Sequence, residues 1–258
     1  MLTFYNELHS QHRGRFEWFR GEMVPCFETP ERADMVVAEL GRRNLGRIVT
    51  PHGVPLTSLE RIHTPRYLHF LRHAWHDWLA LDPGNAGRDA LPSVWPVRTL
   101  RSDIEPDDFT AKLGLYSMDN GTPLTAGTWT AAKTGADCAV NAAHALRLGE
   151  RATFALTRPP GHHAGSDFFG GYCYLNNAAI AVSNAAIKPV GVAVNATAND
   201  TASRFTAGRA GNYYYAVAAI DGTGKGLSEV VKSTQTAIAA GKNAVLTITA
   251  SASGTETG

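Results

Sequence analysis

The sequence has no run of about 18 apolar residues, no closely spaced cysteine pair, no run of lysine and arginine, and no basic and apolar leader at its start. We therefore expect neither a membrane-spanning helix nor a secretory signal. A net charge of +1 gives no excess of basic residues that would favour binding to nucleic acid. Cys26, Cys138 and Cys173 lie too far apart for a disulfide scaffold or a structural zinc site. These absences predict a cytoplasmic globular protein that binds neither membranes nor nucleic acid.

Four residue types are missing from residues 189–258: all ten His, five Trp, three Cys and four Met come earlier, and Ala, Thr and Gly dominate the end. No histidine follows His163. So sharp a change predicts a domain boundary or a junction of unrelated sequences near Lys188, and an uneven single domain is the remaining alternative. We therefore divide the chain into a segment 1–188 and a segment 189–258.

Helical and strand patterns alternate in the first segment. Its first expected helix has Met35, Val36 and Leu40 as an apolar face. Such alternation predicts an α/β fold with a parallel sheet, whose ligands lie beyond the carboxyl ends of the strands. The expected elements are strands at 2–5, 152–157 and 190–194, and helices from Pro30, from Pro65, over 128–148 and from Asn176 or Asn177 to Ile187.

The second segment shows the alternation of side chains that is typical of β-strands with one buried and one exposed face. Tyr213, Tyr215 and Val217 alternate with other residues, and Val245, Thr247 and Thr249 alternate again. These patterns predict a short β-rich segment of antiparallel strands.

The most informative stretches are Arg-Pro-Pro-Gly-His-His at 158–163 and Gly-Gly-Tyr-Cys-Tyr-Leu-Asn-Asn at 170–177. The prolines stiffen the approach and Gly161 lets the backbone turn. Neighbouring imidazoles at His162 and His163 can divide proton transfer between a base and an acid. The alternative is a rigid structural loop whose histidines bond to backbone carbonyls.

The string RPPGHHAGSDFFGGYCYLNNAAIA at 158–181 resembles the central signature of the arginase/deacetylase superfamily. Within it, residues 17–28, 30–34, 63–71 and 114–129 resemble acetylpolyamine amidohydrolases, which are related to histone deacetylases. The resemblance covers residues 1–188 and implies an incomplete parallel-sheet arginase/deacetylase-like fold. It also implies zinc-dependent removal of acetyl groups from acetylated amines, either acetylpolyamines or acetyl-lysine.

The resemblance implies roles for the two histidines. His162 matches a general base or electrostatic member of a tandem pair, and His163 matches the partner that serves as base and then as acid. Zinc would polarise the acetamide carbonyl and activate a water. A tyrosine that stabilises the oxyanion in this family has no visible counterpart in the sequence.

Candidate substrate-binding residues surround this pair. Gly171 and Tyr172 offer a close backbone approach where a substrate carbonyl can lie. Family members that take cationic polyamines carry acidic residues at the rim, which Glu17 matches, and Asp108 and Asp119 lie near other such positions. The alternative for these three acidic residues is an ordinary solvated surface.

The metal ligands expected from the resemblance are missing. The family continues with Asp-x-Asp-x-His after its next strand, whereas this chain has Asn195, Thr197 and Asn199 at those positions. Carboxamide and hydroxyl groups are poor zinc ligands. We therefore expect a deacetylase segment that is catalytically incomplete, with zinc as its cofactor by resemblance only.

A second interpretation is not enzymatic. Residues 212–229 weakly resemble the late strands of a fibronectin type III-like sandwich, which suggests a fused or truncated chain whose β-rich tail is an adhesion or assembly module of a virion or surface protein. Under the first interpretation the partner is a small acetylated amine. An incomplete sheet with an exposed edge also makes a homodimer a reasonable expectation.

Overall fold

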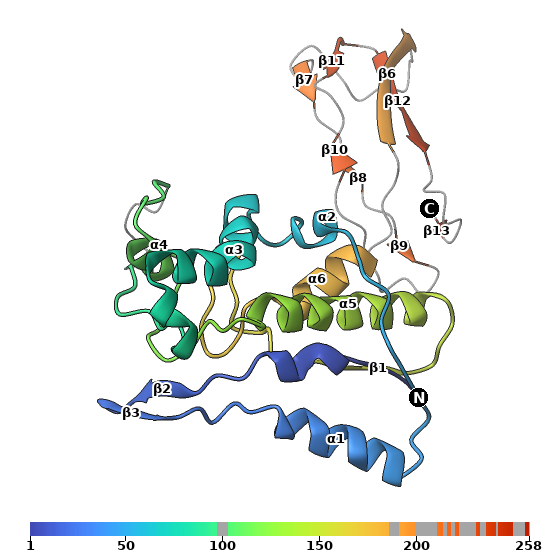
Figure 1. The fold of residues 1–258 in the computed structure, drawn as a ribbon. Helices are drawn as coiled ribbons and strands as arrows, with labels where there is room; N and C mark the ends of the chain where they lie inside the picture. Colours follow the sequence, from blue (N-terminus) through green and yellow to red (C-terminus); the bar gives the residue numbers. More distant parts are fainter. Residues whose placement is uncertain are drawn as a thin grey trace. The chain divides into compact units, whose positions relative to one another are not determined.

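The structure, a computed structural model, divides into two compact units, Met1–Ala185 and Ala186–Gly258 (Figure 1). Each unit is described by itself. The residues that the structure describes are 1–96, 103–185, 191–199, 211–213, 216–217, 220–221, 231–232, 236–240, 242–249 and 256–257.

A parallel sheet of three strands lies in the first unit. Its order is β4 (Arg47–Val49), β1 (Leu2–Tyr5) and β5 (Thr153–Leu156). In the register of the sheet, Leu2 lies opposite Arg47 on one side and opposite Thr153 on the other. The α/β fold with a parallel sheet, as predicted from the alternating pattern, is confirmed.

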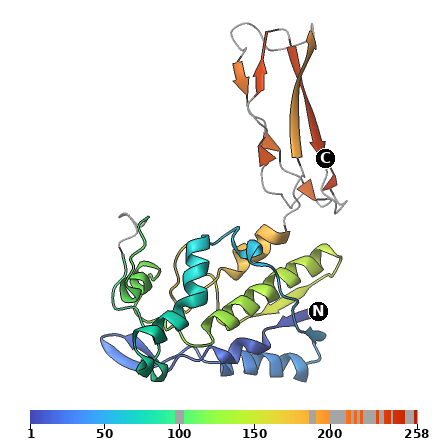
Figure 2. The same ribbon diagram turned by 45° about the horizontal axis from the view of Figure 1, so that its top comes forward.

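Helices lie on both sides of this sheet (Figures 1 and 2). The long helix α5 packs against β1 and β5, and α1 lies on the opposite side of β1. The remaining elements of the unit are η1 (Glu7–Gln11), the hairpin of β2 (Phe16–Phe19) and β3 (Glu22–Pro25), α1 (Glu31–Arg42), α2 (Leu56–Leu59), α3 (Pro65–Leu81), η2 (Pro83–Gly87), α4 (Phe109–Leu115), α5 (Thr128–Arg147) and α6 (Asn177–Ala185).

Local capping explains where three of the helices begin. Thr64 accepts a hydrogen bond from the amide of Tyr67 and is followed by proline at the first position of α3. Asp108 caps α4 by accepting a hydrogen bond from the amide of Ala111. The side chain of Asn176 accepts from the amide of Ala179, so Asn176 rather than its neighbour caps α6.

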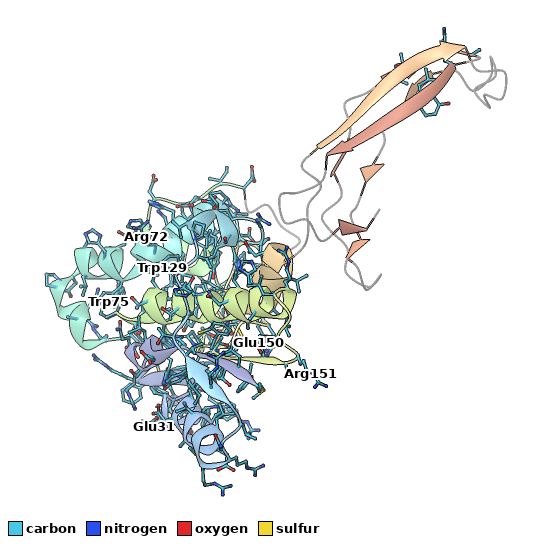
Figure 3. All side chains as sticks on the ribbon, turned by 90° about the vertical axis from the view of Figure 1, so that its right-hand side faces the viewer. Glu31, Arg72, Trp75, Trp129, Glu150 and Arg151 are labelled. Atoms are coloured by element: carbon cyan, nitrogen blue, oxygen red, sulfur yellow. The ribbon has the colours of Figure 1, made fainter. Side chains whose placement is uncertain are left out.

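The main core lies where α3, α4, α5 and α6 meet. Tyr67, Phe70 and Leu71 of α3 are buried there, and Trp129 of α5 packs against the cluster (Figure 3). The apolar face predicted for α1 is wrong in part. Leu40 is buried, whereas Met35 is 67% exposed and Val36 is 38% exposed, because no described element covers that side of the helix.

The strand expected at 190–194 does not join the parallel sheet. It belongs to β6 (Gly191–Asn199), which pairs antiparallel with β12 (Lys242–Thr249) in the second unit. A long antiparallel ladder satisfies more backbone groups than the four-residue β5 could offer. The predicted position of the strand is thus right and its partner is wrong.

The described residues of the second unit lie mostly in short antiparallel strands. Val217 lies in such a strand, and Tyr213 lies in another, whereas Tyr215 falls outside the described residues. No helix in the described part combines the length and the apolar character needed to cross a bilayer. The other strands are β7 (Gly211–Tyr213), β8 (Ala216–Val217), β9 (Ile220–Asp221), β10 (Val231–Lys232), β11 (Thr236–Ile238) and β13 (Glu256–Thr257).

Candidate functional site

The loop that follows β5 begins with a buried arginine. The Arg158 side chain is 3% exposed, and its Nη1 donates to the carbonyls of His9 at 2.7 Å and His12 at 2.6 Å. Its Nε donates to Oε1 of Glu28 at 2.9 Å. The carbonyl of Arg158 accepts from Nδ2 of Asn6 at 2.7 Å. These bonds fix the start of the loop against the N-terminal segment.

Glu28 is the acidic partner of Arg158 and is itself buried, with 9% of its side chain exposed. Its Oε2 has no hydrogen-bond partner within the described residues. Burial raises the pKa of this carboxyl, although the Arg158 guanidinium opposes that effect by favouring the charged form. Loss of either Glu28 or Arg158 would leave the charge of the other buried without a partner, which would destabilise the fold.

The two adjacent histidines lie four and five residues after Arg158, on the surface of the first unit. Both His162 and His163 are exposed, with ring centroids 4.3 Å apart and planes tilted by 51°. They line an open cavity of about 490 Å³ together with Glu28, Arg32, Ala33, Val36, Leu156, Thr157, Arg158, Pro160, Gly171 and Tyr172. Because both residues line the cavity, both can contact a ligand in it, as proton transfer would require.

Two glycines allow this arrangement. A Cβ on Gly161 would lie 2.3 Å from the carbonyl oxygen of Leu175, so the loop reaches the segment before α6 only with glycine there. Gly171 has a φ of +54°, and a Cβ on it would lie 2.6 Å from Cδ2 of His163. The second glycine therefore packs directly against an imidazole of the pair.

Tyr172 links the cavity to the N-terminal hairpin. Its backbone φ is +63°, and its amide donates to Oγ1 of Thr122 at 3.1 Å. Its hydroxyl donates to Oε1 of Glu17 at 2.7 Å. Burial, followed by this bond to the carboxylate, raises the pKa of the Tyr172 hydroxyl. The phenol is thus held as a neutral donor to Glu17.

The predicted acidic residues do not form a charged rim. Glu17 is 2% exposed, and its Oε2 accepts from the amide of Phe27 at 3.1 Å. Asp119 organises its own loop by accepting from the amide and hydroxyl of Thr122, and it also accepts from the amide of Gly171. Asp108 is exposed, caps α4 and does not line the cavity. Of these three, Glu17 and Asp119 reach the site, through neighbours that line it.

Comparisons with known proteins show to which family this chain belongs. Residues 26–194 match the histone deacetylase domain. The chain is 46% identical over 181 residues to acetylpolyamine amidohydrolase 2 of Pseudomonas aeruginosa, which covers 70% of this chain and 52% of that protein. The chain belongs to the histone deacetylase domain family. The family resemblance predicted from the sequence is therefore confirmed.

Other members of the histone deacetylase domain family give the same extent of similarity. Acetylpolyamine amidohydrolase of Mycoplana ramosa is 38% identical over 181 residues, again 70% of this chain and 52% of the relative. A crystal structure of acetylpolyamine aminohydrolase from Burkholderia pseudomallei has a TM-score of 0.66 and 34% identity, covering 72% of this chain and 52% of that one. The chain thus spans about half the length of the relatives that it matches.

The family implies zinc, and the described residues do not fit it. They contain no group of three or more His, Cys, Asp or Glu side chains that could hold a metal ion. Asn195, Thr197 and Asn199 all belong to β6, where Asn195 lies opposite Val245 and Asn199 opposite Lys242 of β12. Neutral carboxamide and hydroxyl oxygens are not a zinc donor set.

Two contacts between side chains of the site were not predicted from the sequence. Glu28 pairs with Arg158, and Glu17 with Tyr172, across more than a hundred residues of sequence in each case. Both acidic residues lie within the stretch 17–28 that carries the family resemblance, which was the one available signal. Contacts between residues so far apart in sequence follow from the fold and have no local pattern.

Proposed function

We propose that this chain supplies the histidine-bearing half of a deacetylase site for acetylated polyamines. The observation that carries the proposal is the exposed pair His162 and His163, 4.3 Å apart at the carboxyl end of β5 and facing an open cavity. The names of relatives that are 46% and 38% identical support the acetylated polyamine as substrate.

In this proposal the two imidazoles move protons. One takes a proton from the water that attacks the acetamide carbonyl, and the other delivers a proton to the departing amine, so that amide and water yield acetate and free amine. Tyr172 and Gly171 shape the wall beside them, and Glu17 positions Tyr172 through its hydroxyl. Glu17, Asp108 and Asp119 do not present a free acidic rim, so choice of a polycation rests on the relatives rather than on these carboxylates.

We also propose that the described chain does not hold catalytic zinc by itself. Without a metal, an attacking water keeps a pKa near its bulk value, far above what an imidazole can deprotonate. Among the described residues, no carboxylate is hydrogen-bonded to a ring nitrogen of His162 or His163, where it would raise the basicity of the imidazole. The isolated chain should therefore bind an acetylated amine and fail to turn it over.

Binding and turnover test the two parts separately. Imidazole resonances are recorded by NMR while N-acetylputrescine is added, with the exposed His76 of α3 as an internal control, and acetate release is measured with and without zinc. We expect shifts at His162 and His163 alone, no acetate above the blank, and less than one zinc per chain. Absence of shifts would overturn the substrate assignment, and acetate release with stoichiometric zinc would overturn the incompleteness.

A second candidate is a fused chain whose second unit serves adhesion or assembly. It is favoured by one observation: β6, which the family match partly covers, pairs with β12 rather than with the parallel sheet. Melting the full chain with and without zinc separates the candidates, because only a working site raises the midpoint with metal. All three cysteines are free and buried, which suits the reducing cytoplasm that we propose as its location.

A further inference from the structure

Helix α3 carries three histidines on the side that faces away from the core. His69, His73 and His76 follow one another at intervals of four and three residues, each about one turn of an α-helix. The opposite side of the helix packs into the main core, which holds α3 in place. His69 and His76 are exposed and His73 is half-buried. Three imidazoles therefore share one accessible face of a fixed helix.

The rings of His69 and His73 lie next to each other. Their centroids are 4.3 Å apart and their planes are tilted by 35°. Two imidazole nitrogens that each bind one metal ion at about 2.0–2.1 Å are at most about 4 Å apart. Because His69 is exposed, its ring can rotate to bring a nitrogen to this distance without any movement of the helix. The pair is therefore spaced to chelate one ion from two successive turns.

A backbone carbonyl determines which nitrogen of His73 is available to a metal. Nδ1 of His73 lies 2.8 Å from the carbonyl oxygen of His69. A carbonyl oxygen only accepts, so in the neutral ring Nδ1 carries the proton and Nε2 keeps its lone pair. Histidines that bind metals usually have this arrangement, in which the second nitrogen donates to a carbonyl or a carboxylate and holds the ring in place. His73 is thus oriented to offer Nε2 as a ligand.

The charges next to the pair do not exclude a cation. Nδ1 of His76 donates to Oδ1 of Asp77 at 3.2 Å, and 41% of the Asp77 side chain is exposed. Arg72 is exposed on the same stretch of α3 (Figure 3). The carboxylate offsets the repulsion that the guanidinium exerts on a cation, and solvent screens both charges. A divalent ion at His69 and His73 therefore meets no net positive charge from these two neighbours.

We propose that His69 and His73 form a surface site for a divalent first-row transition-metal ion, with water completing the coordination. Imidazole nitrogens suit Cu(II), Ni(II) and Zn(II), and a given nitrogen site binds Cu(II) most tightly of the three. Among the described residues the site has two protein ligands, fewer than the three or four of catalytic and structural zinc sites. The bound ion is therefore exchangeable. Its binding is independent of His162, His163 and the proposed deacetylation.

Titration of the full chain with Cu(II), followed by calorimetry and electron paramagnetic resonance, tests the site. We expect the tightest Cu(II) to bind once per chain, with hyperfine splitting from imidazole nitrogen, and Mg(II), which prefers oxygen ligands, not to bind there. His69→Gln and His73→Gln should each weaken this Cu(II) at least tenfold, because one imidazole alone cannot chelate. Affinity unchanged in both variants, or one Cu(II) shared by two chains, would overturn the proposal.

The pair His162 and His163 provides a matched control, because its ring centroids are also 4.3 Å apart. These two histidines are adjacent in a loop, whereas His69 and His73 are one helical turn apart. The double variant His162→Gln, His163→Gln should keep the affinity for the tightest Cu(II) within threefold, and so should the exposed His144→Gln of α5. Loss of that Cu(II) from the double variant would place the site in the loop and overturn the proposal.

Thermal melting with Ni(II), which does not oxidise thiols, gives a second readout. An ion that bridges two turns of α3 binds the native chain and not the unfolded one, so it should raise the midpoint. The double variant His69→Gln, His73→Gln should show no rise, and its circular dichroism without metal should match that of the parent chain. An equal rise in both chains, or none in either, would refute the site. The zinc melts that test the proposed function are made in this double variant, so that α3 does not contribute to them.

Discussion

Replacing Arg158 by methionine should destabilise the first unit by about 3–5 kcal/mol, the usual cost of breaking a buried ion pair by removing one partner. The guanidinium is 3% exposed and donates to the Glu28 carboxylate and to the carbonyls of His9 and His12. Methionine fills most of the volume and leaves the Glu28 charge buried without a cation. Glu28→Gln keeps an acceptor for Nε but leaves the Arg158 charge buried without its anion, so it should also destabilise the unit, by less than Arg158→Met because the carbonyls of His9 and His12 still accept from the guanidinium.

Urea unfolding followed by tryptophan fluorescence measures this effect in the full chain. All five tryptophans precede residue 188, so the signal reports on the first unit alone. The double variant Arg158→Met with Glu28→Gln should be more stable than Arg158→Met, because the uncompensated carboxylate is gone. A loss under about 1 kcal/mol for Arg158→Met, or a double variant less stable than it, would refute this account of the loop.

The pH dependence of Arg158→Met gives an independent check. Burial raises the pKa of Glu28 in the folded protein, and removal of the arginine takes away the attraction that opposes this. A carboxyl with a raised folded pKa gives its full stability below its unfolded pKa and loses it as the pH rises through the folded value. The cost of Arg158→Met should therefore be larger at pH 8 than at pH 5.

Three further predictions concern the surroundings of the site. Burial lowers the pKa of His63 to about 4, so stability should fall by roughly 3 kcal/mol as the pH drops from 6.5 towards 4. His63→Gln should flatten this acid limb in urea titrations, whereas the exposed His76→Gln should not. Gly171→Ala should cost about 1–3 kcal/mol in unfolding and shift the neighbouring imidazole resonance, with Gly41→Ala, which meets open space, as control. Tyr172→Phe should cost about 2 kcal/mol by removing a donor to a buried carboxylate, and an unchanged midpoint would contradict that bond.

Local patterns were sufficient to predict β1, β5, α1, α3, α5 and α6 of the first unit, whereas the β2–β3 hairpin, β4, α2 and α4 were not predicted. The Thr-Pro pair before α3 and the cap at Asn176 are short-range signals, and the structure has a helix after each. The parallel sheet follows from the alternation of strand and helix, and the position of the histidine loop follows from the rule about carboxyl ends. These predictions depend on interactions between residues that are near in sequence.

Partners that come together only in the fold were not predictable. The pattern of α1 predicts an apolar face of Met35, Val36 and Leu40 but cannot show that Met35 has nothing packed over it. The strand at β6 was recognised from its composition, yet the choice between β5 and β12 depends on the whole tail. Glu17 was expected at an acidic rim because of the family resemblance, and its bond to Tyr172 supplies the compensation that lets it be buried.

The open cavity has a consequence for specificity. His162 and His163 lie at the surface of the unit, and the cavity that they line is open to solvent. An open cavity contacts a ligand on one side only, whereas a typical small-molecule site buries most of its ligand. Selection among similar ligands at this wall would therefore rest on the few polar groups that line it.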